Sequence, residues 1–225
     1  MKRKINIMTG KEKVNKEIDF YFKEENINKK KKIEQNIKID ELGSWIKHES
    51  NFIDNQLDIY KKLKKEIKWE KKEVIIYGKS IMQPRLIGFQ STNKKSMKYS
   101  GIEFKSEPIS ETMQILLNKV NEYMKIEYNS IFCNFYENGN NYIGPHSDSY
   151  LTNDNIHPIV SLSFGTTRKF YMKNIKDTKD IKKYELKGGD IFLMGGNCQK
   201  YWKHYVPKEL KIKDGRINLT FRIIK

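Results

Sequence analysis

Hydrophobic residues are distributed unevenly along this chain, and their spacing changes twice. Residues 1–40 hold few hydrophobic residues and carry 12 Lys or Arg against 7 Asp or Glu, a composition typical of a flexible basic extension. From residue 54 onward, Leu57, Tyr60, Leu63 and Ile67 recur at helical spacing. They predict an amphipathic helix whose apolar stripe packs on a sheet. Residues 41–225 are expected to form one domain.

The same spacing predicts a second helix from Ser110 to Met124. Its expected buried stripe consists of Met113, Leu116, Leu117 and Val120. Between the two helices, a short strand from Val74 to Lys79 is predicted to enter a glycine turn. A polar loop is expected after it, marked by the segments 83–85 and 98–101.

Beyond residue 130, apolar and polar residues alternate with a period of two, which predicts a series of short strands. The predicted strands are Ile131–Tyr136, Tyr142–His146, Ile159–Gly165, Lys169–Met172, Lys183–Leu186, Asp190–Met194 and Ile217–Ile224. Glycine-containing turns separate them. Two helices followed by many short strands predict an α+β fold, in which an antiparallel double-sheet barrel carries helices on one side.

Charge and cysteine content restrict the class of protein. The formal net charge is +16, with 44 basic against 28 acidic residues, which favours a polyanionic partner, nucleic acid first and a membrane surface second. A general over-use of lysine is the alternative explanation. Two cysteines are too few for a disulfide framework, and we find neither a bilayer-length apolar run nor a secretory signal. We expect a soluble intracellular protein, nuclear or cytoplasmic.

A His-x-Asp pair is the first candidate for chemistry. His146 and Asp148 share a face if the strand beginning at Tyr142 continues through them. His204 lies 58 residues later and must come from a different strand. Two histidines and one carboxylate form a facial triad that binds Fe(II) and leaves positions open for substrate and dioxygen. A surface histidine beside a loop aspartate is the alternative interpretation.

The C-terminal strand supports the metal interpretation. Strict alternation places Arg216, Asn218, Thr220 and Arg222 on one face. A solvent-facing polar side is one interpretation of this face, but two guanidiniums bracketing two hydrogen-bonding residues suit a bound anion, because arginine matches a carboxylate bidentately. The two arginine Cα atoms would lie roughly 20 Å apart in an extended strand. They are therefore expected to hold a dicarboxylate from its two ends.

The strand Ile131–Tyr136 repeats this arrangement. Asn134 and Tyr136 share a face, and their amide and phenol groups are expected to hydrogen-bond the same anion. Together, the metal triad and the dicarboxylate clamp predict an oxygenase that uses Fe(II), 2-oxoglutarate and dioxygen.

Five segments carry a family resemblance: Asn134–Tyr136, Tyr142–Asp148, Pro158–Gly165 with Arg168, Trp202–His204 and Arg216–Arg222. With these segments in this order, the chain resembles the AlkB family of Fe(II)/2-oxoglutarate dioxygenases, most closely the branch that repairs alkylated double-stranded DNA. The resemblance extends from about residue 50 to the end. It implies a double-stranded β-helix (jelly-roll) core over residues 129–225, preceded by helices and a nucleotide-recognition lid over residues 41–128.

By position, the resemblance implies that the triad binds iron and that the polar residues of the two strands bind 2-oxoglutarate. The implied iron ligands are His146, Asp148 and His204, and the implied 2-oxoglutarate contacts are Asn134, Tyr136, Arg216, Thr220 and Arg222. Upstream, the segment Tyr77-Gly78-Lys79 resembles a hairpin that inserts an aromatic wedge into a duplex to expel the damaged base. Base flipping is required because the methylated atom lies inside the stack. Lys79 and Arg85 are then expected to contact phosphate or the opposite strand.

Two further positions match the pocket for the flipped base. Tyr99 matches an aromatic that stacks on the base, and Met97 stands where relatives carry a second aromatic. Ser149, a further expected substrate contact, and Tyr150 replace residues that are often acidic in relatives. These replacements affect the expected choice of base and leave the iron chemistry unaffected.

The resemblance implies oxidative demethylation of 1-methyladenine and 3-methylcytosine in DNA by a monomeric enzyme, with release of formaldehyde. Three alternatives remain open at this stage. The first is the same chemistry on RNA, and the second is a non-enzymatic basic module that binds nucleic acid. The third is a protein hydroxylase, which has little use for the Tyr77 segment or for the strong positive charge.

Overall fold

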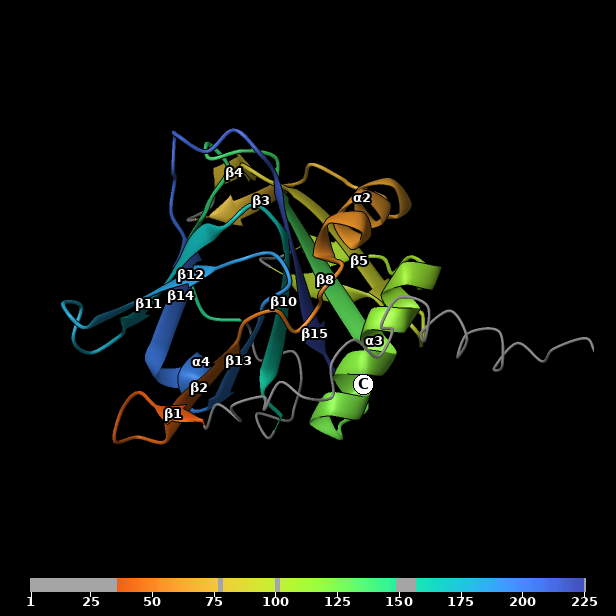
Figure 1. The fold of residues 1–225 in the computed structure, drawn as a ribbon. Helices are drawn as coiled ribbons and strands as arrows, with labels where there is room; N and C mark the ends of the chain where they lie inside the picture. The colour runs from red at the N-terminus through yellow and green to blue at the C-terminus, as the bar shows by residue number, and fades with distance from the viewer. Residues whose placement is uncertain (1–35, 77–78, 100–101, 149–156, 225) are drawn as a thin grey trace, which may run out of the picture. The chain divides into compact units, whose positions relative to one another are not determined.

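Two antiparallel sheets pack face to face in the computed structural model, which describes residues 36–76, 79–99, 102–148 and 157–224 (Figure 1). In the seven-stranded sheet the order is β1 (Ile37–Lys38), β2 (Ser44–Glu49), β13 (Ile191–Gly196), β10 (Ile159–Gly165), β15 (Arg216–Arg222), β8 (Ser130–Tyr136) and β5 (Leu86–Ser91). In the four-stranded sheet the order is β12 (Ile181–Leu186), β11 (Arg168–Asn174), β14 (Trp202–Val206) and β9 (Ile143–His146). The double-sheet architecture predicted from the alternating pattern is confirmed.

Helices cover one face of the seven-stranded sheet. They are α2 (Gln56–Glu66) and α3 (Glu111–Met124), and a single turn, α4 (Cys198–Tyr201), precedes β14. The apolar face of β8 points toward α2, where the ring of Phe135 lies 6.3 Å from that of Tyr60. Within the described residues, no helix has both the length and the apolar character needed to span a bilayer.

The other face of the large sheet points toward the four-stranded sheet. There Phe192, Met194 and Tyr136 pack with Phe170 and Trp202 from the opposite sheet. Alternation along each strand therefore sends apolar residues toward the helices, while a mixed set of apolar and polar residues faces the space between the sheets.

Two predictions about the N-terminal half need correction. The sequence places Leu57 in the buried stripe of the first helix, but Leu57 is 60% exposed, and the buried residues of α2 are Ile59 and Leu63, followed by buried Ile67 just after its end. The helix is rotated so that positions 59 and 63, one turn apart, meet the sheet. The second correction concerns the predicted polar loop, which instead contains β5.

The strand β5 escaped prediction because five of its six residues are buried, so its sequence does not alternate. Gly88 lies within it at a close approach, where a Cβ atom would lie 2.6 Å from Ile67 Cγ2. Two hairpins flank this strand in the sequence: β3 (Glu73–Ile76) with β4 (Lys79–Met82), and β6 (Met97–Tyr99) with β7 (Ile102–Phe104).

Most of the expected basic extension, residues 1–40, lies outside the described residues. In the part that is described, β1 pairs with β2, and Asp40 accepts a hydrogen bond of 2.6 Å from Trp202 Nε1.

The buried side chain of Arg168 ties two connections of the barrel together. Its guanidinium donates to Asn138 O at 3.1 Å and Asn141 O at 2.9 Å in the β8–β9 connection. It also donates to Pro207 O at 2.8 Å and Glu209 Oε2 at 3.1 Å in the β14–β15 connection. These bonds fix the end of the barrel at which β9 begins.

Candidate active site

Two histidines and one aspartate converge at the edge of the four-stranded sheet. His146, at the end of β9, pairs in register with His204 on β14, and their ring centroids lie 4.3 Å apart. Asp148 follows β9, and its Oδ1 atom lies 3.8 Å from the Nε2 atom of each histidine. One donor atom from each residue lies within 4.8 Å of the other two, which is a facial triad suited to Fe(II).

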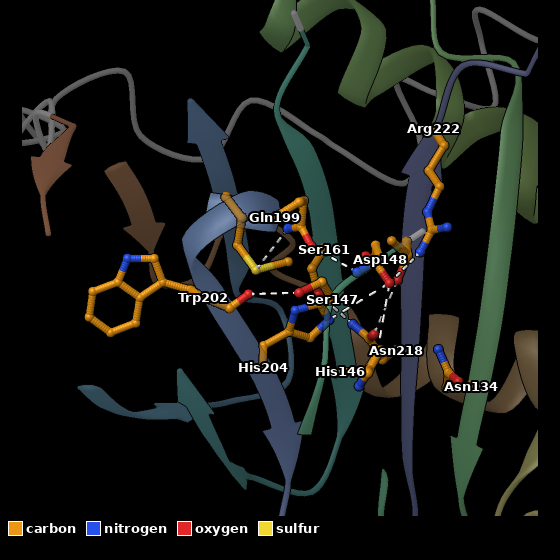
Figure 2. A network of polar contacts seen from close by, with 12 residues as sticks. Asn134, His146, Ser147, Asp148, Ser161, Gln199, Trp202, His204, Asn218 and Arg222 are labelled. Atoms are coloured by element: carbon orange, nitrogen blue, oxygen red, sulfur yellow. Dashed lines mark hydrogen bonds and ion pairs between the residues drawn. The ribbon is translucent and has the colours of Figure 1, made fainter. Parts of the chain in front are cut away.

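Hydrogen bonds around the triad orient its members (Figure 2). His146 Nδ1 lies 2.9 Å from the carbonyl oxygen of Gly144. Because a carbonyl oxygen only accepts hydrogen bonds, Nδ1 carries the proton. The unprotonated Nε2 then has a lone pair that can bind a metal. Ser147 Oγ donates to Trp202 O at 3.0 Å, and the Asp148 amide donates to Gln199 Oε1 at 2.8 Å. The residues after β9 are thereby held against β14 and α4.

Burial sets the protonation states that metal binding requires. Desolvation, with a smaller effect of the nearby His204, lowers the pKa of His146 to about 3. Burial likewise lowers the pKa of His204. Burial alone would raise the pKa of Asp148, but Arg222 and the two histidines together bring it down to about 2. At neutral pH the triad is therefore two neutral imidazoles and one carboxylate, the ionisation states of metal ligands.

Two arginines from β15 lie in the same cavity as the triad. Arg222 Nη2 contacts Asp148 Oδ1 at 2.7 Å, as Figure 2 shows. Arg216, six residues earlier, is 1% exposed, and its Nη2 donates to Ser163 Oγ at 2.9 Å. Desolvation lowers the pKa of Arg216 to about 10. The two cations thus lie at different positions along the cavity wall, one of them beside the metal ligands.

Three buried guanidinium nitrogens lack a hydrogen-bond partner among the described residues: Arg216 Nε, Arg216 Nη1 and Arg222 Nε. An unsatisfied buried donor is costly, and a charged one especially so. A dicarboxylate in this cavity would supply acceptors for these nitrogens. The donor set therefore fits 2-oxoglutarate, and the triad fits Fe(II).

The cavity collects the predicted cofactor residues of both sheet strands. Its wall includes Asn134, Tyr136, Arg216, Asn218, Thr220 and Arg222 together with the triad. Asn218 Nδ2 donates to Ser161 Oγ at 2.5 Å and to Leu162 O at 3.1 Å. The amide of Asn218 is therefore largely engaged by the protein.

Among the expected substrate contacts, Arg85 is expected to contact phosphate or the opposite strand, and the structure places its side chain inside the cavity. It is 4% exposed, lines the cavity, and donates from Nε to Asn134 Oδ1 at 2.6 Å. Its backbone precedes β5, whose pairing with β8 directs the side chain inward. Met97 is buried and also lines the cavity.

The other expected substrate contacts are not positioned by this structure. Tyr77, Gly78 and Ser149 lie outside the described residues, as does Tyr150. Lys79 and Tyr99 are described through their backbone, at the start of β4 and the end of β6.

Sequence reasoning missed several residues that shape the site. Ser163 hydrogen-bonds Arg216, Gln199 accepts from the Asp148 amide, and Phe170 stacks on His204 with centroids 5.6 Å apart. The alternating Ser161 and Ser163 of β10 were a usable signal, since they are polar residues on the cavity side of a central strand. Gln199 has no such signal, because it reaches the site from the turn α4.

A double-sheet barrel with a His-Asp-His triad and a buried anion site defines an iron-dependent oxygenase of the jelly-roll class. Comparison with known proteins agrees: the family model of the 2OG-Fe(II) oxygenase superfamily matches residues 45–222. The chain belongs to this superfamily.

Curated relatives refine the resemblance. The chain is 30% identical over 175 residues to the alpha-ketoglutarate-dependent dioxygenase alkB homolog 3 of Bos taurus, covering 74% of this chain and 60% of that protein. It is 28% identical over 191 residues to the DNA oxidative demethylase ALKBH2 of Arabidopsis thaliana, covering 72% and 60%. These relatives support an AlkB-like 2-oxoglutarate oxygenase, although the chain spans only about 60% of their length.

The solved structure of OsALKBH1 superposes with a TM-score of 0.52 at 21% identity, covering 79% of this chain and 97% of that one. At this identity the likeness supports the fold.

Proposed function

We propose that this protein is an Fe(II)- and 2-oxoglutarate-dependent oxidative demethylase that repairs 1-methyladenine and 3-methylcytosine in DNA. The observation that carries the proposal is the pairing of a facial triad with unpartnered guanidinium nitrogens of Arg216 in one cavity. A non-enzymatic nucleic-acid-binding module needs neither feature. The relative named a DNA oxidative demethylase and the net charge of +16 favour nucleic acid as the substrate.

The side chains have separate tasks in this proposal. His146, Asp148 and His204 hold the iron, with His146 oriented by its bond to Gly144 O. Arg216 would bind a carboxylate of 2-oxoglutarate, and Ser163 orients its guanidinium. When bound, iron would activate dioxygen, which places one oxygen atom in the N-methyl C–H bond and the other in succinate as 2-oxoglutarate loses CO2; the N-hydroxymethyl product then releases formaldehyde and leaves the unmodified base. Phe170 and Met194 add apolar surface to the otherwise polar cavity wall, which helps to exclude water.

The base enters from the side where the cavity is open. His146 keeps 22% of its side chain exposed, whereas His204 keeps 9%, so the opening lies nearer to His146. Met97 lines the cavity, and we assign Met97 and Tyr99 to the pocket of the flipped base, with Ser149 following the triad in sequence. Tyr77, Gly78 and Lys79 form the proposed wedge segment for double-stranded DNA, and the enzyme acts as a monomer.

The test is a demethylation assay on defined oligonucleotides. The protein is incubated with Fe(II), 2-oxoglutarate and a duplex carrying a single 1-methyladenine, and the product is weighed by mass spectrometry. The oligonucleotide is expected to lose one methylene with formation of succinate, and the variant His146→Ala is expected to leave it unchanged. If equal amounts of methylated oligonucleotide remain with wild type and with His146→Ala, the proposal is wrong.

The same assay on single-stranded DNA and on RNA decides the substrate class. Faster reaction of the duplex supports the proposed double-stranded preference and the wedge role of Tyr77. If methylated RNA reacts faster than either DNA substrate, the proposed function becomes RNA demethylation at the same site instead of DNA repair.

A further inference from the structure

The outer face of the four-stranded sheet carries basic and aromatic residues that the iron site does not use. Phe170, Met172 and His204 point inward from β11 and β14. Because alternate residues of a strand point to opposite faces, their neighbours point outward. The outward residues that matter here are Lys169, Tyr171, Lys173, Lys183, Lys203 and Tyr205; we call this set the outer platform.

Cross-strand pairing brings the two tyrosines of the outer platform together. Tyr171 and Tyr205 are in direct register on neighbouring strands, and their ring centroids lie 5.4 Å apart with the planes at 90°. Both side chains are partly exposed. Lys183, opposite Tyr171 on β12, places its Nζ 5.8 Å from the Tyr171 ring centroid. An aromatic pair with an adjacent cation thus lies at the centre of the exposed face.

Most charges of the outer platform are poorly compensated; Lys169 is the exception, because its Nζ lies 3.9 Å from Glu209 Oε1. Lys173 and Lys203 lie directly opposite each other, an arrangement that destabilises a sheet. Neither of them nor Lys183 forms an ion pair with any described residue. Among the outward positions of β11, β12 and β14, Glu185 is the one carboxylate, and it lies opposite Lys169. An anionic ligand relieves the repulsion that the fold itself leaves in place.

We infer that the outer platform binds single-stranded nucleic acid. Exposed aromatic rings offer stacking surfaces for unpaired bases, and flanking lysines neutralise the phosphates. A duplex has no free base faces to stack, and a flat sheet face does not enter a groove, so a single strand is the better fit. An acidic protein surface would satisfy the lysines and leave the tyrosine faces without a function.

The outer platform and the iron cavity lie on opposite sides of the same sheet. On β14, His204 points into the cavity, and the next residue, Tyr205, points to the outer platform. A bound single strand therefore leaves the cavity free. The inference does not depend on demethylation, because it concerns unmodified nucleic acid on a separate face.

The test measures binding of fluorescent oligothymidylate and oligouridylate of about 12 nucleotides, a length within the range of single-strand sites, to the full chain by anisotropy. Neither oligonucleotide contains an N-methylated base. The double variant Tyr171→Ala/Tyr205→Ala is expected to weaken binding about tenfold or more, since each stacked base contributes substantially. Tyr171→Phe/Tyr205→Phe keeps both rings and is expected to bind within about twofold of wild type. Melting temperatures of the variants verify folding.

A charge test uses a matched control. Lys173→Gln/Lys203→Gln is expected to reduce the slope of log affinity against log salt by about 1.4, at about 0.7 per single-strand phosphate contact. The control Lys61→Gln/Lys65→Gln removes the same charge from exposed positions of α2 and is expected to leave the slope unchanged. In addition, bromouracil-substituted strands are expected to photocrosslink to the peptides that contain Tyr171 or Tyr205.

Several outcomes overturn the inference. One is an affinity of Tyr171→Ala/Tyr205→Ala for the oligonucleotides that equals the affinity of wild type. Another is a loss of affinity in Tyr171→Phe/Tyr205→Phe that equals the loss in the alanine variant. A control pair that lowers the slope as much as the platform pair also overturns it, as does an unmodified duplex that competes as well as a single strand. Demethylation that fails in the assay of the proposed function leaves these binding results unaffected.

Discussion

Arg222 Nη2 lies 2.7 Å from Asp148 Oδ1, so the last residue of β15 is the counter-ion of a carboxylate in the metal triad. Both side chains are largely buried. Among the described residues, Arg222 is the arginine or lysine that forms an ion pair with Asp148. The ion pair thereby couples the anion-binding strand to the iron site.

Replacing that counter-ion is expected to make the protein depend on metal for stability. Breaking a buried ion pair costs about 3–5 kcal/mol, so metal-free Arg222→Gln is expected to melt about 10 °C below wild type. Mn(II) supplies the lost positive charge, and its stabilising shift is therefore expected to be larger in the variant. Thermal melts with and without Mn(II) measure both quantities. Arg222→Lys is the control that keeps the charge, and equal Mn(II) shifts in Arg222→Gln and wild type contradict the prediction.

Arg216 is expected to serve ligand binding at the expense of stability. Its guanidinium is buried with two unpartnered nitrogens among the described residues, so Arg216→Met is expected to leave the melting temperature of the ligand-free protein equal or higher. In wild type with Mn(II), 2-oxoglutarate at about 100 times its Kd stabilises by about 2.7 kcal/mol. In the variant this gain is expected to disappear. A ligand-induced shift of wild-type size in Arg216→Met rules out Arg216 as the carboxylate site.

Arg85 is expected to act on 2-oxoglutarate through Asn134. Its Nε–H bonds Asn134 Oδ1, which turns the Asn134 NH2 group toward the cavity as a donor. Loss of a hydrogen bond to a charged group, worth about 1.5–3 kcal/mol, predicts that Arg85→Met raises KM for 2-oxoglutarate at least about tenfold. Succinate formation at varied 2-oxoglutarate measures this effect. A phosphate contact predicts instead that the slope of log affinity for duplex DNA against log salt falls by about 0.9 in Arg85→Met. That result with an unchanged KM for 2-oxoglutarate would contradict the role through Asn134.

Two glycines near the start of β9 are expected to respond in opposite ways to the same substitution. A Cβ atom on Gly139 would lie 1.8 Å from Glu209 O, whereas one on Gly144 meets nothing within 4 Å. Gly139→Ala is therefore expected to destabilise by about 3 kcal/mol, lowering Tm by about 9 °C. Gly144→Ala is the matched control and is expected to melt within about 1 °C of wild type. Equal melting temperatures of the two variants would contradict this prediction, because they would mean that the β14–β15 connection at Glu209 shifts away from the added methyl group without cost.

The sequence determined whatever depends on local periodicity. Alternation along β15 placed Arg216, Asn218, Thr220 and Arg222 on one face, and the cavity wall contains all four. The predicted C-terminal strands match their observed counterparts to within two residues at every end, although β14 was not among them. Burial on one face of a strand imposes this alternation directly on the sequence, so it can be read there without any knowledge of partners.

Only the tertiary structure decided which distant residues meet. The contact of Arg222 with Asp148 joins positions 74 residues apart, and Arg85 reaches Asn134 from just before β5, a strand whose buried sequence shows no alternation. The sequence therefore indicated a metal triad and an anion site, but it did not show that one arginine of the clamp is the counter-ion of the triad. Such contacts depend on strand order and register across two sheets, which no local pattern encodes.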